Sequence, residues 1–478
     1  MHEVILSVGI DIGTSTTQLV FSELTIENQA TSYTVPRISI VDKKVIFRSE
    51  IFFTPLLSQT EIDGEAVKQI LESQYQKAGM KPEDVKTGAV IITGETARKA
   101  NANVVLETLS GLAGDFVVAT AGPDLESVLS GRGAGADTFS KEKRCVVANV
   151  DVGGGTSNIA VFDHGSLIGT TCLDIGGRLI KVDRETRRIT YIYSKIQKLA
   201  MNEGIPISVG DIADTAKIRR ICTLMADLIG QSLHIQPKSV YYNEIFTNGG
   251  KGLKQEVIPT AVTFSGGVAD YIYQEADSDL FQYGDIGIIL GQEIRKHCFL
   301  QQLELYQAVE TIRATVVGAG THTTEISGST ISYEKNQLPM KNIPILKISE
   351  EEEKTCLGIE ESIRRQIPLY ISEGEAVQIA ISFEGTGYSG FAGIQELAQA
   401  IINGAEVLIR LKYPLLIVAE HDIAKALGHA LNVKLKHSKE VICIDGIRTQ
   451  SGDYIDIGEP IGEGRVVPVV IKTLIFNS

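Results

Sequence analysis

Two short turns constrain this 478-residue chain more than any other feature of its sequence. They span Asp11–Thr16 and Asp151–Thr156, are rich in glycine and hydroxyl residues, and each opens with an aspartate. Each turn follows one apolar, strand-like run and precedes another, so the sequence predicts strand, tight turn, strand at both places. Glycines let the backbone approach a ligand closely, and successive free N–H groups and hydroxyls form a site for an anion.

The leading aspartates suggest a metal-assisted phosphate site. A carboxylate beside a phosphate is repelled by it, so each aspartate is expected to act through a magnesium ion and its waters. Two such hairpins facing each other would hold the phosphates of a nucleotide from both sides. A third turn, Gly266-Gly267, follows the strand-like run 261–265 and offers bare backbone on which an adenine or ribose could lie.

The sequence lacks the motifs of two other common nucleotide-binding folds. The chain has no Gly-x-x-x-x-Gly-Lys-Ser/Thr motif, so a P-loop is not expected. No Gly-x-Gly-x-x-Gly opens a helix after the first strand, which disfavours dinucleotide binding there.

Composition narrows the class of protein further. The 59 acidic and 45 basic side chains give a formal charge of −14, which argues against nucleic-acid partners and anionic membranes. No apolar stretch reaches the roughly 18 residues that span a bilayer, and no signal peptide is recognisable, so we expect a cytoplasmic protein. The six widely spaced cysteines are expected to be buried free thiols rather than disulfides or metal ligands.

Strand-like and helix-like runs alternate along the chain, which predicts an α/β fold. We expect a first lobe over 1–148, a second lobe over 149–334, and an acidic, linker-like segment over 335–362. A C-terminal α/β unit then covers 363–478. Two interpretations of that unit stay open: it is a separate domain that engages a partner, or it completes one of the lobes.

The order of first phosphate hairpin, second phosphate hairpin and Gly-Gly turn resembles the superfamily of actin, sugar kinases and heat-shock-chaperone ATPases. Within that superfamily, the chain most closely resembles the ethanolamine ammonia-lyase reactivating factors, the EutA family, over essentially its full length. The stretches that carry the resemblance are 91–102, 121–127, 131–136, 317–323 and 468–476.

This resemblance implies an actin-like (ribonuclease H-like), two-lobed ATPase with an additional C-terminal α/β segment. It implies a slow, magnesium-dependent ATPase with ATP and Mg²⁺ as cofactors and ethanolamine ammonia-lyase as partner. A factor of this family acts like a chaperone: it opens the partner so that damaged cobalamin leaves and fresh adenosylcobalamin enters. The resemblance also implies a cytoplasmic location and allows association with the ethanolamine-utilisation bacterial microcompartment.

Residue roles carry over from the superfamily position by position. Asp11 and Asp151 match the two aspartates that hold hydrated magnesium, and with Glu95 they are the candidates for catalysis. Asp174 is a further metal candidate or simply a turn aspartate, and Asp183 is a weaker candidate for the metal or water shell. The phosphate cradles and the adenosine turn share glycine and hydroxyl residues: Gly13, Thr14, Ser15, Thr16, Gly153, Gly154, Gly155, Thr156, Gly266 and Gly267.

Two other functions on the same fold remain as alternatives. A small-molecule kinase would need an aspartate base over the substrate hydroxyl, and no distinctive motif for one is recognisable. A filament-forming relative of actin would assemble in a nucleotide-dependent way. The sequence leaves open the oligomeric state and the role of the Gly/Thr/Ser-rich stretch 318–330.

Overall fold

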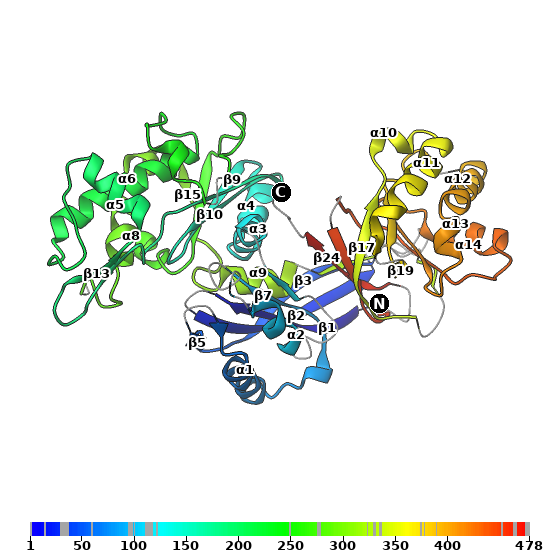
Figure 1. Ribbon diagram of the computed structural model, residues 1–478, viewed down its shortest axis with the longest axis horizontal. Helices are drawn as coiled ribbons and strands as arrows, with labels where there is room; N and C mark the ends of the chain where they lie inside the picture. Colours follow the sequence, from blue (N-terminus) through cyan, green and yellow to red (C-terminus); the bar gives the residue numbers. More distant parts are fainter. Residues whose placement is uncertain are drawn as a thin grey trace.

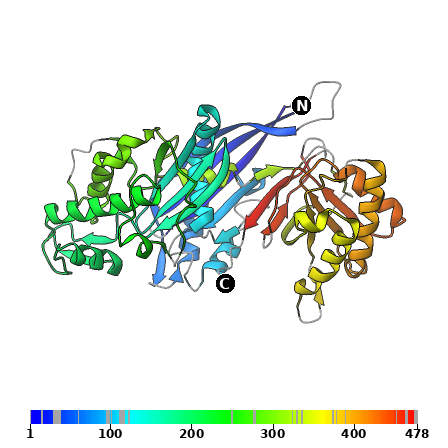
Figure 2. The ribbon, with the colours of Figure 1, turned by 90° about the horizontal axis from the view of Figure 1, so that it is seen from above.

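A computed structural model describes residues 2–13, 16–28, 38–58, 61–93, 99, 101–109, 118–120, 123–247, 250–274, 279–322, 324–327, 331–333, 337–372, 375–376, 378–388, 390–450, 453–461 and 466–473. Three sheet-centred parts follow one another along the long axis of the molecule (Figures 1 and 2). The second lobe lies at one end, the C-terminal unit at the other, and the sheet of the first lobe between them.

The first lobe is built on a sheet with the strand order β3-β2-β1-β7-β8. Strands β1, β2 and β3 are antiparallel neighbours, whereas β1, β7 and β8 run parallel. The elements are β1 (His2–Ile12), β2 (Thr16–Asn28), β3 (Ile38–Arg48), β4 (Phe52–Phe53), β5 (Leu56–Ser58), β6 (Glu61–Ile62), α1 (Gly64–Ala78), β7 (Val85–Ile92), α2 (Ala102–Leu109) and β8 (Val118–Thr120).

The sheet of the second lobe repeats this topology, with the order β11-β10-β9-β14-β15. Its first three strands are again antiparallel, and β9, β14 and β15 are parallel. The repetition confirms the predicted α/β class with two lobes of one kind. The strands are β9 (Val146–Val152), β10 (Ser157–Asp163), β11 (Ser166–Leu173), β14 (Ala261–Ser265) and β15 (Glu304–Leu305).

Helices and one hairpin cover the second sheet and enclose the largest apolar core of the described residues. Helix α6 begins at the N-cap Asp214, whose carboxylate accepts the N–H groups of Ala216 and Lys217, and it buries one apolar face against this core. These elements are β12 (Ile180–Val182), β13 (Ile189–Ile192), α5 (Ser194–Asn202), α6 (Thr215–Ser232), α7 (Asp270–Tyr273) and α8 (Gly287–Lys296).

Among the described residues, helices α3 (Pro123–Gly133) and α9 (Ala314–His322) contact both lobes, whereas α4 (Ala136–Lys143) packs on β9 and β10 of the second lobe. Helix α9 returns from the second lobe and packs on β1 and β2 of the first lobe and on α3 (Figure 1). Glycines make this packing possible, because a Cβ on Gly318 would lie 2.0 Å from the carbonyl oxygen of Leu129, and one on Gly9 would lie 2.2 Å from that of Val316. The glycines of this stretch that the structure describes therefore serve close packing between α9 and its neighbours.

The C-terminal unit has a sheet of seven strands in the order β16-β24-β23-β17-β20-β21-β22. Strands β17, β20, β21 and β22 are parallel, and the helices that connect them pack on one face. The elements are β16 (Thr324–Ile326), β17 (Met340–Lys347), α10 (Glu350–Glu353), α11 (Cys356–Gln366), β18 (Ile371–Ser372), β19 (Glu375–Ala376), β20 (Ala380–Phe383), α12 (Phe391–Gly404), α13 (Glu406–Ile409), β21 (Leu415–Ala419), α14 (Ala424–Lys434), β22 (Val441–Ile444), β23 (Asp453–Ile457) and β24 (Pro468–Thr473).

The interval 335–362, expected to be linker-like, supplies strand β17, helix α10 and most of α11 to this unit. Strand β24 pairs with β16, and its Val470 packs with Ile91 and Ala319 of the first-lobe region. We therefore propose that the third unit begins near residue 324 and is packed on the first lobe.

Two further observations concern the chain as a whole. Each of the six cysteines has a free thiol. In the part of the chain that the structure describes, no helix is both long enough and apolar enough to cross a membrane.

Candidate functional site

The first predicted phosphate hairpin connects β1 to β2. Asp11 lies near the end of β1, and the turn closes through a hydrogen bond of 2.8 Å from the Gly13 N–H to the Thr16 carbonyl. The hydroxyl of Thr54 donates to the Gly13 carbonyl at 2.8 Å and supports the turn from outside. Thr14 and Ser15 lie outside the described residues.

The second predicted hairpin connects β9 to β10 and closes in the same way. The Gly153 N–H donates to the Thr156 carbonyl at 2.9 Å, so Gly153 and Thr156 correspond to Gly13 and Thr16. The N–H groups of Gly177 and Arg178 donate to the carbonyls of Gly153 and Gly154 and buttress this turn. A Cβ on Gly155 would meet nothing within 4 Å, so the tip of the turn is open to a ligand.

The two leading aspartates have equivalent surroundings. The Thr93 hydroxyl donates to Asp11 Oδ1 at 2.9 Å, and the Ser265 hydroxyl donates to Asp151 Oδ1 at 2.6 Å. Thr93 directly follows β7 and Ser265 ends β14, the strands that lie parallel to β1 and β9 in their sheets. Neither hydroxyl residue was predicted from the sequence to belong to the site. Each stands between an apolar strand and a glycine, and this pattern could have indicated a site residue at the end of a strand.

Burial shapes the electrostatics of this pair. It raises the pKa of Asp11 to about 7, against the hydrogen bond from Thr93, and the nearby charge of Asp151 contributes to the rise. Burial likewise raises the pKa of Asp151 to about 6, against the hydrogen bond from Ser265. Two carboxylates that interact while both are buried mark a candidate functional site.

The pair has the chemistry of a site for a hydrated divalent cation. Among the residues that the structure describes, neither Asp11 nor Asp151 forms an ion pair, and a magnesium ion would supply the missing positive charge. No group of three or more His, Cys, Asp or Glu side chains in a metal-ligand arrangement occurs within those same residues. Carboxylate oxygens are nevertheless the ligands that magnesium prefers.

The predicted adenosine turn lies directly against the second hairpin. Gly266 has a φ of +85°, and a Cβ there would come within 2.4 Å of the Val152 carbonyl oxygen, so only glycine fits without strain. The Val268 N–H donates to the same carbonyl at 3.2 Å, which fixes the turn to the end of β9. Gly267 has open space around its Cβ position.

Asp174 is held by its own protein partners beside the second hairpin. Its carboxylate pairs with Lys195 Nζ at 2.6 Å and accepts the hydroxyl of Thr247 at 2.8 Å. Two residues further on, a Cβ on Gly176 would lie 2.5 Å from the Gly154 carbonyl oxygen. Asp174 therefore lies close to the second predicted hairpin, with its charge already matched by Lys195.

Asp183, the weaker candidate for the metal or water shell, is not joined to this site by any contact that the structure describes. Asp183 caps an exposed turn, where hydrogen bonds from the N–H and hydroxyl of Thr186 hold the pKa of its carboxyl below the ordinary value. Glu95 lies outside the described residues, as does its neighbour Arg98.

Comparisons with known proteins bear on the whole chain. A solved structure of the Ppx/GppA family member of Aquifex aeolicus superposes with a TM-score of 0.40 at 14% identity, over 66% of this chain and 97% of that one. The proteins described as "Ethanolamine ammonia-lyase reactivase EutA" from Salmonella typhimurium (strain LT2) and Escherichia coli (strain K12) are each 36% identical to it, over 482 and 480 residues respectively and 99% of either chain. The family model described as "Ethanolamine utilisation protein EutA" matches residues 3–477. The chain therefore belongs to the EutA family.

Proposed function

We propose that this protein is an ATP-dependent reactivase of ethanolamine ammonia-lyase. It binds the inactivated enzyme and opens it so that damaged cobalamin leaves and fresh adenosylcobalamin enters. The observation that carries the proposal is the 36% identity, over 99% of either chain, to two proteins described as ethanolamine ammonia-lyase reactivases. The family's description as ethanolamine utilisation proteins supports a place in the cytoplasm with the ethanolamine-utilisation microcompartment.

The nucleotide of the proposal is ATP with magnesium, held between the two hairpins. Asp11 and Asp151 would hold the hydrated cation, which when bound neutralises charge on the phosphates. The backbone N–H groups and hydroxyls of the turns Gly13–Thr16 and Gly153–Thr156 would bind the phosphates, and Gly266 and Gly267 would lie against the adenosine. The matched closure of the two turns and the raised pKa values of the two aspartates support this assignment.

Hydrolysis in such a site depends on positioning and electrostatic stabilisation rather than on a nucleophilic side chain. We infer that Asp174 is a positioning residue, because Lys195 already balances its charge and Gly176 packs on the second hairpin. Asp183 is best explained as a cap of its own turn.

Movement of the lobes would couple the nucleotide to the partner. The segment 308–313 touches both lobes: the Thr311 carbonyl accepts the Gly266 N–H, while Glu310 pairs with Arg48 of the first lobe. Arg313 also donates to the Ser49 carbonyl at 3.0 Å. A nucleotide that favours one arrangement of the two lobes would shift the segment 308–313. Ethanolamine ammonia-lyase, if it binds that arrangement more tightly, would then change its own conformation with each cycle of ATP turnover.

The kinase alternative receives less support. Both relatives carry the reactivase description, and neither description names a phosphoryl acceptor. A reactivase should hydrolyse ATP slowly in the absence of any acceptor, whereas a kinase would consume ATP only when its substrate is present.

The deciding experiment uses ethanolamine ammonia-lyase inactivated with cyanocobalamin. Adding this protein with ATP, magnesium and free adenosylcobalamin should restore deaminase activity and release cyanocobalamin into the filtrate. The same mixture with ADP, or with the Asp151→Asn variant, should restore little. Recovery that is independent of nucleotide, or no recovery with intact protein and ATP, would refute the proposal.

A further inference from the structure

A fourth glycine-containing turn lies in the C-terminal unit, apart from the three turns of the candidate nucleotide site. The segment Gly385–Gly390 reads Gly-Thr-Gly-Tyr-Ser-Gly and has the spacing Gly-x-Gly-x-x-Gly. It follows strand β20 and opens helix α12, which crosses over to the parallel neighbour β21. In open α/β sheets, this connection is where the backbone approaches the diphosphate of a nucleotide.

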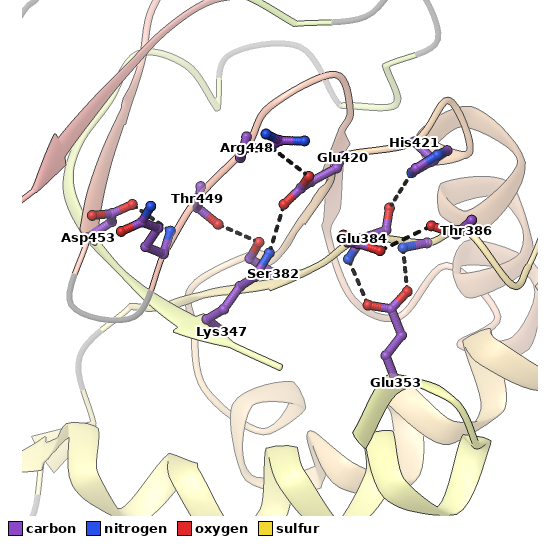
Figure 3. A network of polar contacts seen from close by, with 12 residues as sticks. Lys347, Glu353, Ser382, Glu384, Thr386, Glu420, His421, Arg448, Thr449 and Asp453 are labelled. Carbon is purple, nitrogen blue, oxygen red and sulfur yellow. Dashed lines mark hydrogen bonds and ion pairs between the residues drawn. The ribbon is translucent and has the colours of Figure 1, made fainter. Parts of the chain in front are cut away.

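The start of this loop already binds an anion, and that anion belongs to the chain itself. The carboxylate of Glu353, from helix α10, accepts the N–H of Glu384 at 2.8 Å and the N–H of Gly385 at 2.6 Å (Figure 3). Gly385 has a φ of +89°, and successive N–H groups with such a residue form an anion-binding nest. Glu353 is buried, with 7% of its surface exposed, and the structure therefore shows this nest holding a carboxylate away from water.

Beyond the nest, the loop leaves room for a larger molecule. Cβ atoms on Gly387 and Gly390 would meet nothing within 4 Å, and both glycines are exposed. Gly390 is the N-cap of α12 and, as a glycine, has no side chain with which to cap the helix. A ligand with more than one phosphate could extend from the nest across this open backbone.

An acidic residue and two cations stand beside the loop. Glu420 follows β21, and its N–H donates to the Phe383 carbonyl at 3.1 Å, which sets it next to the start of the loop. Its carboxylate is held by Lys347 at 3.1 Å and by Arg448 at 3.1 Å (Figure 3). A carboxylate at the end of the neighbouring strand is the group that accepts a ribose hydroxyl in dinucleotide sites. The Arg448 side chain is 82% exposed, so it can exchange its ion pair with Glu420 for one with a phosphate.

We propose that the described residues of this loop, Gly385–Tyr388 and Gly390, form a second nucleotide site, for a ligand in which a diphosphate is linked to ribose; Ser389 lies outside the described residues. Glu353 is its internal occupant: the ligand's phosphate replaces the Glu353 carboxylate on the N–H groups of Glu384 and Gly385. Glu420 receives the ribose hydroxyls, and Arg448 balances the phosphate charge. Occupancy therefore releases the Glu353 carboxylate from the end of β20, while the hydrogen bond from the Tyr388 hydroxyl to the Glu353 carbonyl still holds α10 against the loop.

The test measures binding to the full-length chain by calorimetry, with NAD⁺, ADP and pyrophosphate as probes. Magnesium is omitted, and ADP is measured with Asp151→Asn so that the first site does not contribute. Glu353→Gln removes the competing charge and should lower the dissociation constant for NAD⁺ and ADP at least tenfold. Glu351→Gln, which removes a neighbouring exposed carboxylate, should change neither constant, because Glu351 pairs with Lys354 and not with the loop.

Gly387→Val should abolish binding of NAD⁺ and ADP, both in the otherwise unchanged protein and in Glu353→Gln. The valine side chain would fill the open space of the proposed site, and the variant should fold because no protein atom lies within 4 Å of the Cβ position. Gly390→Val is the second blocking variant, and circular dichroism with thermal melting checks that each variant is folded. The proposal fails if folded Glu353→Gln binds none of the probes, or if both valine variants bind as tightly as the parent. It also fails if pyrophosphate binds as tightly as NAD⁺ and ADP, because the ribose would then contribute nothing.

Discussion

The hydroxyl of Ser265 donates a hydrogen bond of 2.6 Å to the carboxylate of Asp151, across 114 positions of the sequence. Thr93 makes the corresponding bond to Asp11 in the other lobe. Each hydroxyl lies at the end of the parallel strand beside the aspartate's own strand: Ser265 is the last residue of β14, and Thr93 directly follows β7. The shared sheet topology therefore orients both carboxylates. The two halves of the candidate site therefore share the same arrangement of strand, aspartate and hydroxyl, although the hydroxyl comes from threonine in one and from serine in the other.

Removing the Ser265 hydroxyl should impair the site without unfolding the protein. Ser265→Ala leaves the buried Asp151 carboxylate without this donor, and we expect ATP turnover to fall by about tenfold, since one hydrogen bond to a charged group contributes about 1.5 kcal/mol or more. Ser265→Thr keeps a hydroxyl, as Thr93 does in the first lobe, and should retain most of the activity. Equal rates for the two variants, with unchanged circular dichroism, would show that this hydrogen bond does not position Asp151.

Asp151→Asn should reduce ATP hydrolysis by roughly 100-fold or more, because it removes one of the two charges proposed to organise the cation. Stability should not fall, since the buried side chain loses a charge that burial disfavours. Asp183→Asn is the matched control and should leave the rate unchanged, because Asp183 caps an exposed turn. Normal turnover by a folded Asp151→Asn variant would remove Asp151 from the proposed cation site.

The two glycines of the proposed adenosine turn should respond differently to alanine. Gly266→Ala places a Cβ at positive φ and 2.4 Å from a backbone oxygen, so we expect a loss of stability of about 2 kcal/mol or more, seen as a lower melting temperature. Gly267→Ala meets open space and should change the free energy of unfolding by less than about 0.5 kcal/mol. It should nevertheless weaken ATP binding, because its methyl group would stand where the adenosine is proposed to lie. Equal melting temperatures for the two variants would contradict the geometry of this turn.

Glu352 should make a pH-dependent contribution to stability. Hydrogen bonds from Arg365 and Ser349 lower the pKa of its carboxyl to about 2 in the folded chain, against 4.5 for the ordinary side chain. A lowered folded pKa means that the contribution is complete above about pH 4.5 and is lost as the pH falls toward 2. Glu352→Gln, which also weakens the capping box with Ser349, should therefore cost about 1 kcal/mol at pH 7 and progressively less below pH 4.5. Denaturant titrations of both proteins at pH 7, 4 and 3 measure this difference, and a constant difference would refute it.

Val470 should be essential for the contact between the last strand and the first lobe. It is fully buried on β24 and packs with Ala89, Ile91 and Ala319. Val470→Ala removes two buried methyl groups, and we expect a loss of about 2 kcal/mol. Hydrogen exchange should then quicken in β7 and α9 as well as in β24. Faster exchange confined to β24 would show that the C-terminal strand is not coupled to the first lobe.

Local features of this protein could be read from its sequence because they depend on residues that are close together in the chain. Helix α1 has its apolar residues at helical spacing, begins after the N-cap Asp63 and ends before Gly79, which adopts a φ of +68°. The two hairpins are equally local, since each turn closes within four residues. Spacing, capping and turn chemistry were sufficient in these cases.

The remaining features depended on contacts between distant parts of the chain. Which strand lies beside β1 or β9 decides that Thr93 and Ser265 reach the aspartates, and this follows from the sheet topology rather than from nearby residues. The same holds for β24, which returns from the end of the chain to pair with β16. The glycines of α9 have a role only because α3 and β1 lie against that helix. A sequence pattern reports the preference of a short segment, whereas the partner of each buried group is decided by packing of the whole chain.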